Sequence, residues 1–140
     1  MKKLINLSML YAIAAIACGV FYREFTKILG YTGQTTLAFT HLHLFTLGTL
    51  LFLVLALFCV QSDLLHLRQF KIFMILYNIG LPFMVIMLFV RGIPQALNTT
   101  LTATASAAVS GIAGISHILL TVAIVMMFIA IKKARYHCEK

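Results

Sequence analysis

Apolar residues gather into four long blocks along the chain, with short polar stretches between them. The blocks cover residues 4–22, 36–60, 72–90 and 103–131. Each is long enough to cross a hydrocarbon core of about 30 Å, which takes about 20 helical residues. The pattern therefore predicts an all-α fold: one integral membrane domain over residues 1–140, built as a bundle of four transmembrane helices.

The first block also has the layout of a signal peptide. Lys2 and Lys3 precede an apolar stretch, and small residues lead up to Cys18. The apolar run continues beyond Cys18 to Phe21 and Tyr22, which are aromatic residues typical of a membrane interface. We therefore expect this block to be a retained membrane helix.

The third and fourth blocks contain residues that shape helix packing. Pro82 lies inside the third block, and a membrane helix tolerates a proline where neighbours satisfy the freed carbonyl, usually with a bend. The fourth block begins with two stripes of small residues spaced four apart. The stripes are Ala103, Ala107 and Gly111, and Ser106, Ser110 and Gly114. One stripe is expected to pack within the bundle, and the other predicts contact with another copy or a flat cofactor.

Composition supports a membrane location. Hydrophobic residues make up 62% of the chain and charged residues 10%, which excludes a soluble domain with a charged surface. The net charge of +8 raises the question of nucleic acid, but the basic residues flank apolar blocks and form no single patch or arm. The lipid bilayer is therefore the expected partner, and no nucleic acid is expected.

Charge also predicts the orientation. Short loops make adjacent helices antiparallel, so four spans put both termini on one side. That side carries eight basic residues, which are Lys2, Lys3, Arg68, Lys71, Lys132, Lys133, Arg135 and Lys140. The other side carries three, which are Arg23, Lys27 and Arg91. Because positive residues concentrate on the cytoplasmic side, both termini are predicted to be cytoplasmic.

Three histidines are expected at membrane depth: His41 and His43 in the outer third, and His117 somewhat nearer the centre. An ionisable residue in this position is a functional hypothesis by default. Residues two apart on a helix point about 200° apart, so His41 and His43 cannot serve one small site together. The structural alternative is that the imidazoles bond to a backbone carbonyl or to Thr40, Thr46 or Ser116.

The acidic residues narrow the possible chemistry. They occur only at Glu24, Asp63 and Glu139, near ends or loops. A proton or cation transporter usually needs a carboxylate at depth, and zinc or magnesium hydrolysis needs oxygen ligands or a general base. Neutral imidazoles in an apolar, aromatic setting favour b-type haem, which needs axial histidines and a cation for its propionates. Arg91 is the predicted cation, with Arg23 or Lys27 as alternatives.

The run Thr40-His41-Leu42-His43-Leu44-Phe45-Thr46-Leu47-Gly48 resembles the His-x-His helix of subunit I of the haem–copper oxidases. There the pair is followed by an apolar stretch and a glycine, matched here by Gly48, and its two imidazoles serve different haems. Arg91 matches the place of a propionate-binding arginine pair. That subunit has twelve helices in three arcs of four. The resemblance therefore implies a homotrimer with haem b between protomers, and a redox partner.

Two ligand pairings are open. In the trimer, His41 of one copy and His43 of the next would be the axial ligands. In a monomer, His117 would pair with one of them across the bundle.

The whole chain also resembles an uncharacterised family of small bacterial four-span proteins, through Tyr22-Arg23-Glu24-Phe25-Thr26 before a Gly-Thr loop. This resemblance implies the bacterial cytoplasmic (inner) membrane as the location.

Several functions are open from the residues alone. The haem interpretation implies electron transfer, or sensing of haem or gas. Alternatives are a cofactor-free transporter or channel using Asn78 and Pro82, an accessory subunit, or a copper or zinc binder using the three histidines and Cys138. The sequence shows no nucleophile–base pair, so no catalytic residue is predicted.

Overall fold

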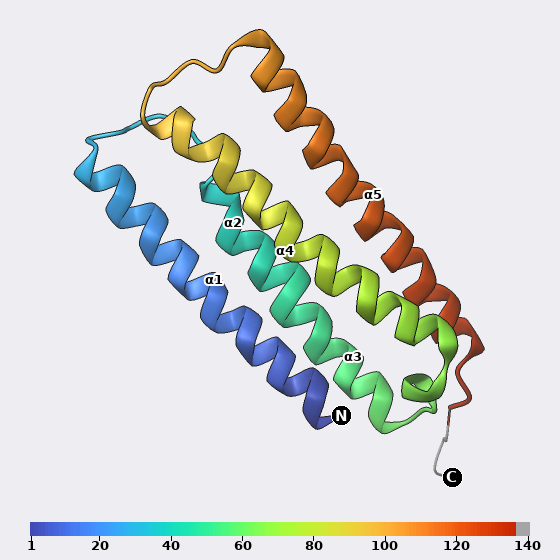
Figure 1. The fold of residues 1–140 in the computed structure, drawn as a ribbon. Coiled ribbons are helices and arrows are strands. Elements are labelled where there is room, and N and C mark those ends of the chain that lie inside the picture. The colour runs from blue at the N-terminus through green and yellow to red at the C-terminus, as the bar shows by residue number, and fades with distance from the viewer. Residues whose placement is uncertain (137–140) are drawn as a thin grey trace.

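The computed structural model describes residues 1–136 and is all-α (Figure 1). Four helices are long and apolar enough to cross a membrane, as the four blocks predict. They are α1 (Lys2–Ile28), the second span Ala38–Val60, α4 (Arg68–Ala96) and α5 (Ala103–Lys133). The second span is α2 (Ala38–His43), a π-helical segment η1 (Leu44–Leu50) and α3 (Leu51–Val60). A short 3₁₀ turn, η2 (Leu64–His66), precedes α4. The chain is thus a multi-pass membrane protein.

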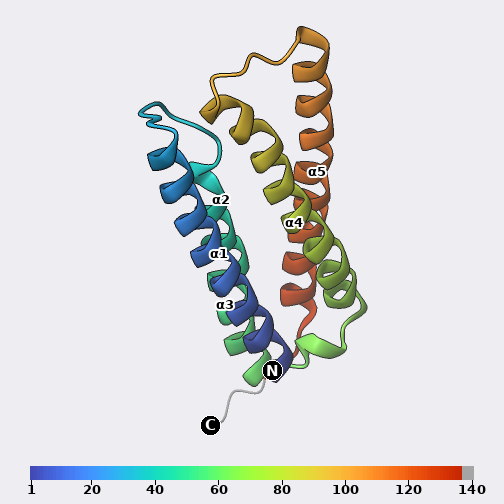
Figure 2. The ribbon, with the colours of Figure 1, turned by 60° about the vertical axis from the view of Figure 1, so that its left-hand side comes forward.

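Consecutive spans run antiparallel and pair along their lengths. α1 lies beside the second span, and α5 lies beside α4 (Figures 1 and 2). An aromatic cluster at the centre joins the two pairs. The ring of Phe52 stacks on Tyr11 of α1 at 5.7 Å and meets Tyr77 of α4 edge-on at the same centroid distance. Phe73 of α4 completes the cluster.

Two of the helices are longer than their apolar blocks. α1 continues past residue 22 to Ile28, and α4 exceeds residues 72–90 at both ends. Hydropathy measures the part of a helix that lies in hydrocarbon, whereas the helical hydrogen bonds continue into the interface. The second and fourth spans agree with the predicted ranges within two residues.

Threonine side chains join the start of the second span to the C-terminal end of α4. Thr35 donates to the carbonyl of Gly92 at 2.8 Å, and Thr36 donates to that of Leu88 at 3.0 Å. The backbone N–H of Thr36 donates to Gln95 Oε1 at 2.8 Å. α4 continues without interruption through both of its prolines, Pro82 and Pro94.

Both described ends of the chain meet the loop between the second span and α4. The backbone N–H of Arg135 donates to Asp63 Oδ1 at 2.8 Å, and Ser62 forms an antiparallel bridge with Tyr136. Met1 shares a pocket with Leu65 of the same loop. The start of α1 and the end of α5 therefore lie at one end of the bundle, as an even number of spans requires. Cys138, Glu139 and Lys140 lie outside the described residues.

Candidate functional site

The π-helical segment begins directly after His43. Two donors from other helices bond to its carbonyl groups: Ser8 donates to Thr49 O at 2.8 Å, and Tyr77 donates to Leu47 O at 2.9 Å. At Gly48, a Cβ would lie 2.6 Å from Tyr11 Cβ, so only glycine allows this approach of α1. π-Helical insertions occur frequently at functional sites. The structure gives Gly48 a packing role, and its predicted part in cofactor binding stays a prediction.

His43 has one ring nitrogen fixed by its own helix. Nδ1 lies 2.7 Å from the carbonyl oxygen of Phe39. Because a carbonyl only accepts, Nδ1 carries the proton and Nε2 keeps its lone pair. The partly exposed ring is edge-on to Phe39 and lines a shallow apolar groove with Leu42, Thr46 and Leu47. A histidine that binds a metal through one ring nitrogen usually donates the N–H of its other ring nitrogen to a carbonyl or carboxylate, as His43 does here.

His117 repeats this arrangement on α5. Its Nδ1 lies 3.0 Å from the carbonyl oxygen of Ala113, and the residue is exposed on the surface of the helix. The proton is again assigned to Nδ1, which leaves Nε2 with a lone pair. The structural alternative, a bond from an imidazole to a backbone carbonyl, therefore accounts for one nitrogen of each ring and leaves the other open.

His41 differs from the other two. It faces α1, where a Cβ on Gly19 would lie 3.7 Å from the His41 Cβ and Cγ atoms. Its Nδ1 is buried and has no hydrogen-bond partner among residues 1–136. It lacks the second contact that orients a ligating imidazole, so His43 and His117 fit a ligand role better.

His43 and His117 lie at a similar depth, measured along α4. Before His43, Thr36 bonds to Leu88 of α4, and after it, Leu47 bonds to Tyr77 of α4. His43 therefore lies between the levels of Leu88 and Tyr77. On α5, Ser110 contacts Arg91 and Leu120 contacts Gly80. His117 lies between these two contacts. Both imidazoles are therefore level with the middle of α4, and their depth in a membrane stays a prediction.

The histidines do not form a metal site within the described chain. Among residues 1–136, no three His, Cys, Asp or Glu side chains lie close enough together to hold a metal ion. No hydrogen bond joins any two of His41, His43 and His117 in that range. The predicted pairings stay predictions.

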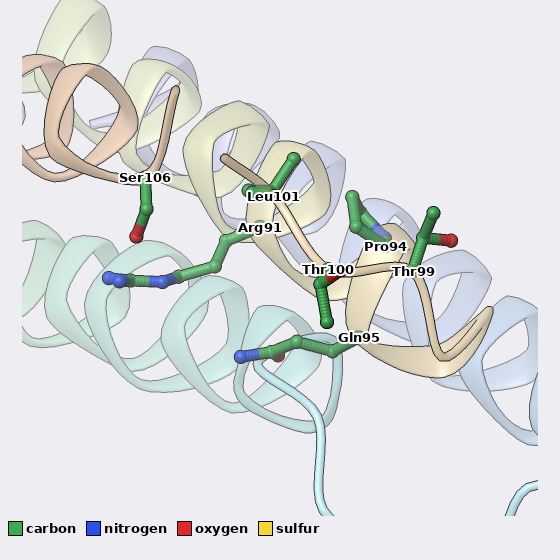
Figure 3. A pocket seen from close by; sticks show the side chains of 7 residues that line it. All are labelled: Arg91, Pro94, Gln95, Thr99, Thr100, Leu101 and Ser106. Carbon is green, nitrogen blue, oxygen red and sulfur yellow. The ribbon is translucent and has the colours of Figure 1, made fainter. Parts of the chain in front are cut away.

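Arg91 lies in a polar pocket at the C-terminal end of α4 (Figure 3). The pocket measures about 280 Å³ and is lined by Arg91, Pro94, Gln95, Thr99, Thr100, Leu101 and Ser106. Arg91 donates to Ser110 Oγ at 3.2 Å, and Ser110 donates to Ser106 O at 2.9 Å. No carboxylate lines the pocket, so its guanidinium, amide and hydroxyl groups suit an anion. The alternative cation Arg23 is paired with Glu24.

Sequence reasoning found Arg91 but missed the groups around it. The hydroxyl-rich run from Thr99 to Ser110 was visible, yet only the path of the loop before α5 brings it to the guanidinium. The sequence pointed to Asn78 as a polar residue of a transport path, but its partner Tyr11 was missed. Tyr11 donates to Asn78 Oδ1 at 2.9 Å across two spans.

Four long apolar helices, with polar side chains bonded to carbonyl groups across the spans, define a small four-span integral membrane protein. The chain belongs to the family described as "Protein of unknown function (DUF2871)", which it matches over residues 1–134. This agrees with the predicted membership of an uncharacterised family. No curated protein and no solved structure matches the chain. The resemblance of residues 40–48 to haem–copper oxidases stays a prediction.

Proposed function

We propose that this chain is an integral membrane b-type haem-binding protein with histidine axial ligands, acting in electron transfer or in haem or gas sensing. The observation that carries the proposal is the state of two imidazoles at membrane depth. His43 and His117 each have Nδ1 bound to a helix carbonyl and Nε2 left as an acceptor. An unpaired acceptor in hydrocarbon is costly, and an iron ion would satisfy it.

The surroundings of His43 fit the group. Phe39, Leu42 and Leu47 supply an apolar wall beside the ring. Arg91, at the outer end of α4, supplies a cation for carboxylates, and its pocket contains no competing acid. Haem ligated by two imidazoles takes up and releases one electron when bound. The protein's own part is to hold the imidazole tautomer, keep water out and neutralise the propionates.

The open face of α5 supports a homotrimer as the assembly. Ala107 and Gly111 are exposed there, and a Cβ added to Gly111 or Gly114 would meet nothing within 4 Å. Small residues let helices of separate chains approach closely. Because the ligating nitrogens face away from the bundle, the second ligand would come from a neighbouring copy. His43 of one copy would pair with His41 or His117 of the next.

The location proposed is the bacterial cytoplasmic membrane. Both described ends of the chain, Met1 and Tyr136, lie at the end of the bundle where the basic residues concentrate, which supports a cytoplasmic placement by the positive-inside rule. A redox partner would then deliver or accept electrons from either side of the membrane.

The test is the visible spectrum of the detergent-purified protein after addition of haem. We expect a Soret band with sharp reduced bands. His43→Ala and His117→Ala should each weaken or shift that band, because an axial ligand is lost. His66→Ala is the matched control, since His66 is exposed in η2, outside the spans.

Two results would overturn this proposal. A protein that stays colourless with added haem would exclude haem binding. An unchanged band in both His43→Ala and His117→Ala would exclude their ligand role. Metal analysis of the same samples would identify copper or zinc instead.

A further inference from the structure

A groove opens between the first turns of α1 and α4, at the end of the bundle where the chain begins. It measures about 380 Å³. Its lining is Met1, Lys3, Leu4, Leu65, Phe70, Lys71, Met74 and Ile75. The histidines and Arg91 are not part of it, so the chemistry of the groove is independent of haem binding.

The mouth of the groove is cationic. Lys3 and Lys71 line it and are exposed, and the α-amino group of Met1 adds a third positive charge. No carboxylate is among the lining residues. Among residues 1–136, side chains form one ion pair, between Arg23 and Glu24. This pair lies in the last turns of α1, away from the groove. Asp63 in the neighbouring loop accepts from the backbone N–H of Arg135, so neither Lys3 nor Lys71 has an ion-pair partner among the described residues.

Two helix N-termini add to this charge. α1 and α4 both begin at the groove, neither has a side-chain cap, and neither has an acid in its first turn. The first amide groups of a helix lack partners, and they carry about half a positive charge together. Acidic residues are usually favoured in the first turn of a helix, whereas the first turns of α1 and α4 contain lysines. An anion at the mouth would satisfy both sets of amide groups.

The floor of the groove is apolar and leads into the membrane. Leu4 and Phe70 form its buried base. Ile75, which is 63% exposed, lies one turn further along α4 than Lys71. One helical turn advances about 5.4 Å, so the groove passes from charged headgroup level to hydrocarbon over that distance. A free anion would contact the mouth alone, but an amphipathic anion would contact both parts.

We propose that this groove binds an anionic phospholipid of the leaflet at this end of the bundle. The phosphate lies among Lys3, Lys71 and the Met1 amino group, and one acyl chain follows Met74 and Ile75. The lysine stems extend along the apolar wall while their ammonium groups reach the phosphate.

Lipid retention tests the proposal. The purified full-length protein is exposed to mixed micelles of phosphatidylglycerol and phosphatidylcholine, and bound lipid is counted by native mass spectrometry. We expect preferential retention of phosphatidylglycerol. The double variant Lys3→Gln/Lys71→Gln should bind it roughly tenfold or more weakly, since each lysine near an anionic surface contributes about fivefold. Lys132→Gln/Lys133→Gln, with the same charge change at the end of α5, should retain it.

Each other outcome overturns the assignment. Equal retention in the Lys3/Lys71 variant would exclude the groove, and equal loss in the Lys132/Lys133 control would indicate general charge attraction. Displacement of the lipid by inorganic phosphate at similar concentration would show that the acyl chain is not recognised. His43→Ala should retain the lipid, so failure of the haem proposal and failure of this one are distinguishable.

Discussion

Gly48 and Gly111 both lie in membrane-spanning helices, but their surroundings are opposite. A Cβ on Gly48 would lie 2.6 Å from Tyr11 Cβ, whereas a Cβ on Gly111 would meet nothing within 4 Å. The seam between α1 and the second span is therefore closed within one chain. The first half of α5 also carries a glycine, Gly111, but on a face that no other part of the described chain covers.

Polar side chains show the same difference. Ser8 of α1 bonds to a carbonyl of another span, while Ser116 of α5 bonds to the carbonyl of Ala113 in its own helix. His117 also bonds to Ala113. The Ser116 hydroxyl and His117 Nδ1 thus bond within α5 itself and need no neighbouring helix. The closed seam needs its neighbour to satisfy the same kinds of groups.

The largest expected effect is on the closed seam. Gly48→Ala should destabilise the fold by about 1–3 kcal/mol, because overpacking forces α1 away from the second span. The measurement is thermal unfolding in detergent. Gly111→Ala is the matched control and should leave the unfolding midpoint unchanged or slightly raised. Equal losses in both variants would contradict the contrast between the two faces.

A smaller effect is expected from single hydroxyl groups. Ser8 and Ser116 are both buried, at 2% and 0% exposure. Ser8→Ala removes a bond between spans and should cost about 0.6 kcal/mol, up to about 1.7, on the scale measured in membrane bundles. Ser116→Ala should cost less, since its carbonyl partner keeps the helical bond. Chemical denaturation in mixed micelles would compare the two, and a larger loss for Ser116→Ala would reverse the interpretation.

The smallest effect on the single chain is expected from Gly111→Leu. The side chain would enter open space, so unfolding should change little. Oligomers cross-linked in native membranes should decrease, because close approach of a second copy is blocked. Val125→Leu, on the exposed surface of the second half of α5, is the control. Unchanged cross-linking in Gly111→Leu would indicate that lipid covers this face.

Much of the fold could be predicted because hydrocarbon thickness sets the length of each apolar block. The ends could not. α1 continues to Ile28 because the helical backbone hydrogen bonds persist among charged residues beyond the apolar block. The π-helical segment has no signature in hydropathy. Gly48 was noticed, but its reason, the ring of Tyr11, lies on another helix.

The candidate site was partly predictable. Helical geometry predicts that His41 and His43 point to separate faces, and residue counting predicts the depth of the three histidines. Which ring nitrogen is bound to a carbonyl depends on the side-chain rotamer. The hydroxyl groups near Arg91 depend on the path of residues 97–102. Neither can be derived from local pattern.

The π-helical segment has a consequence for how this span could change. Each residue of an α-helix turns the chain by about 100°, and a π-helical turn accommodates one more residue than an α-turn does. Deleting one residue between Leu44 and Leu50 would therefore restore regular α-helical winding, and the portion that contains His41 and His43 would keep nearly the same facing relative to the portion anchored by Phe52. The loss of a single codon there would thus leave the two histidines and the aromatic cluster in nearly the same relative orientation.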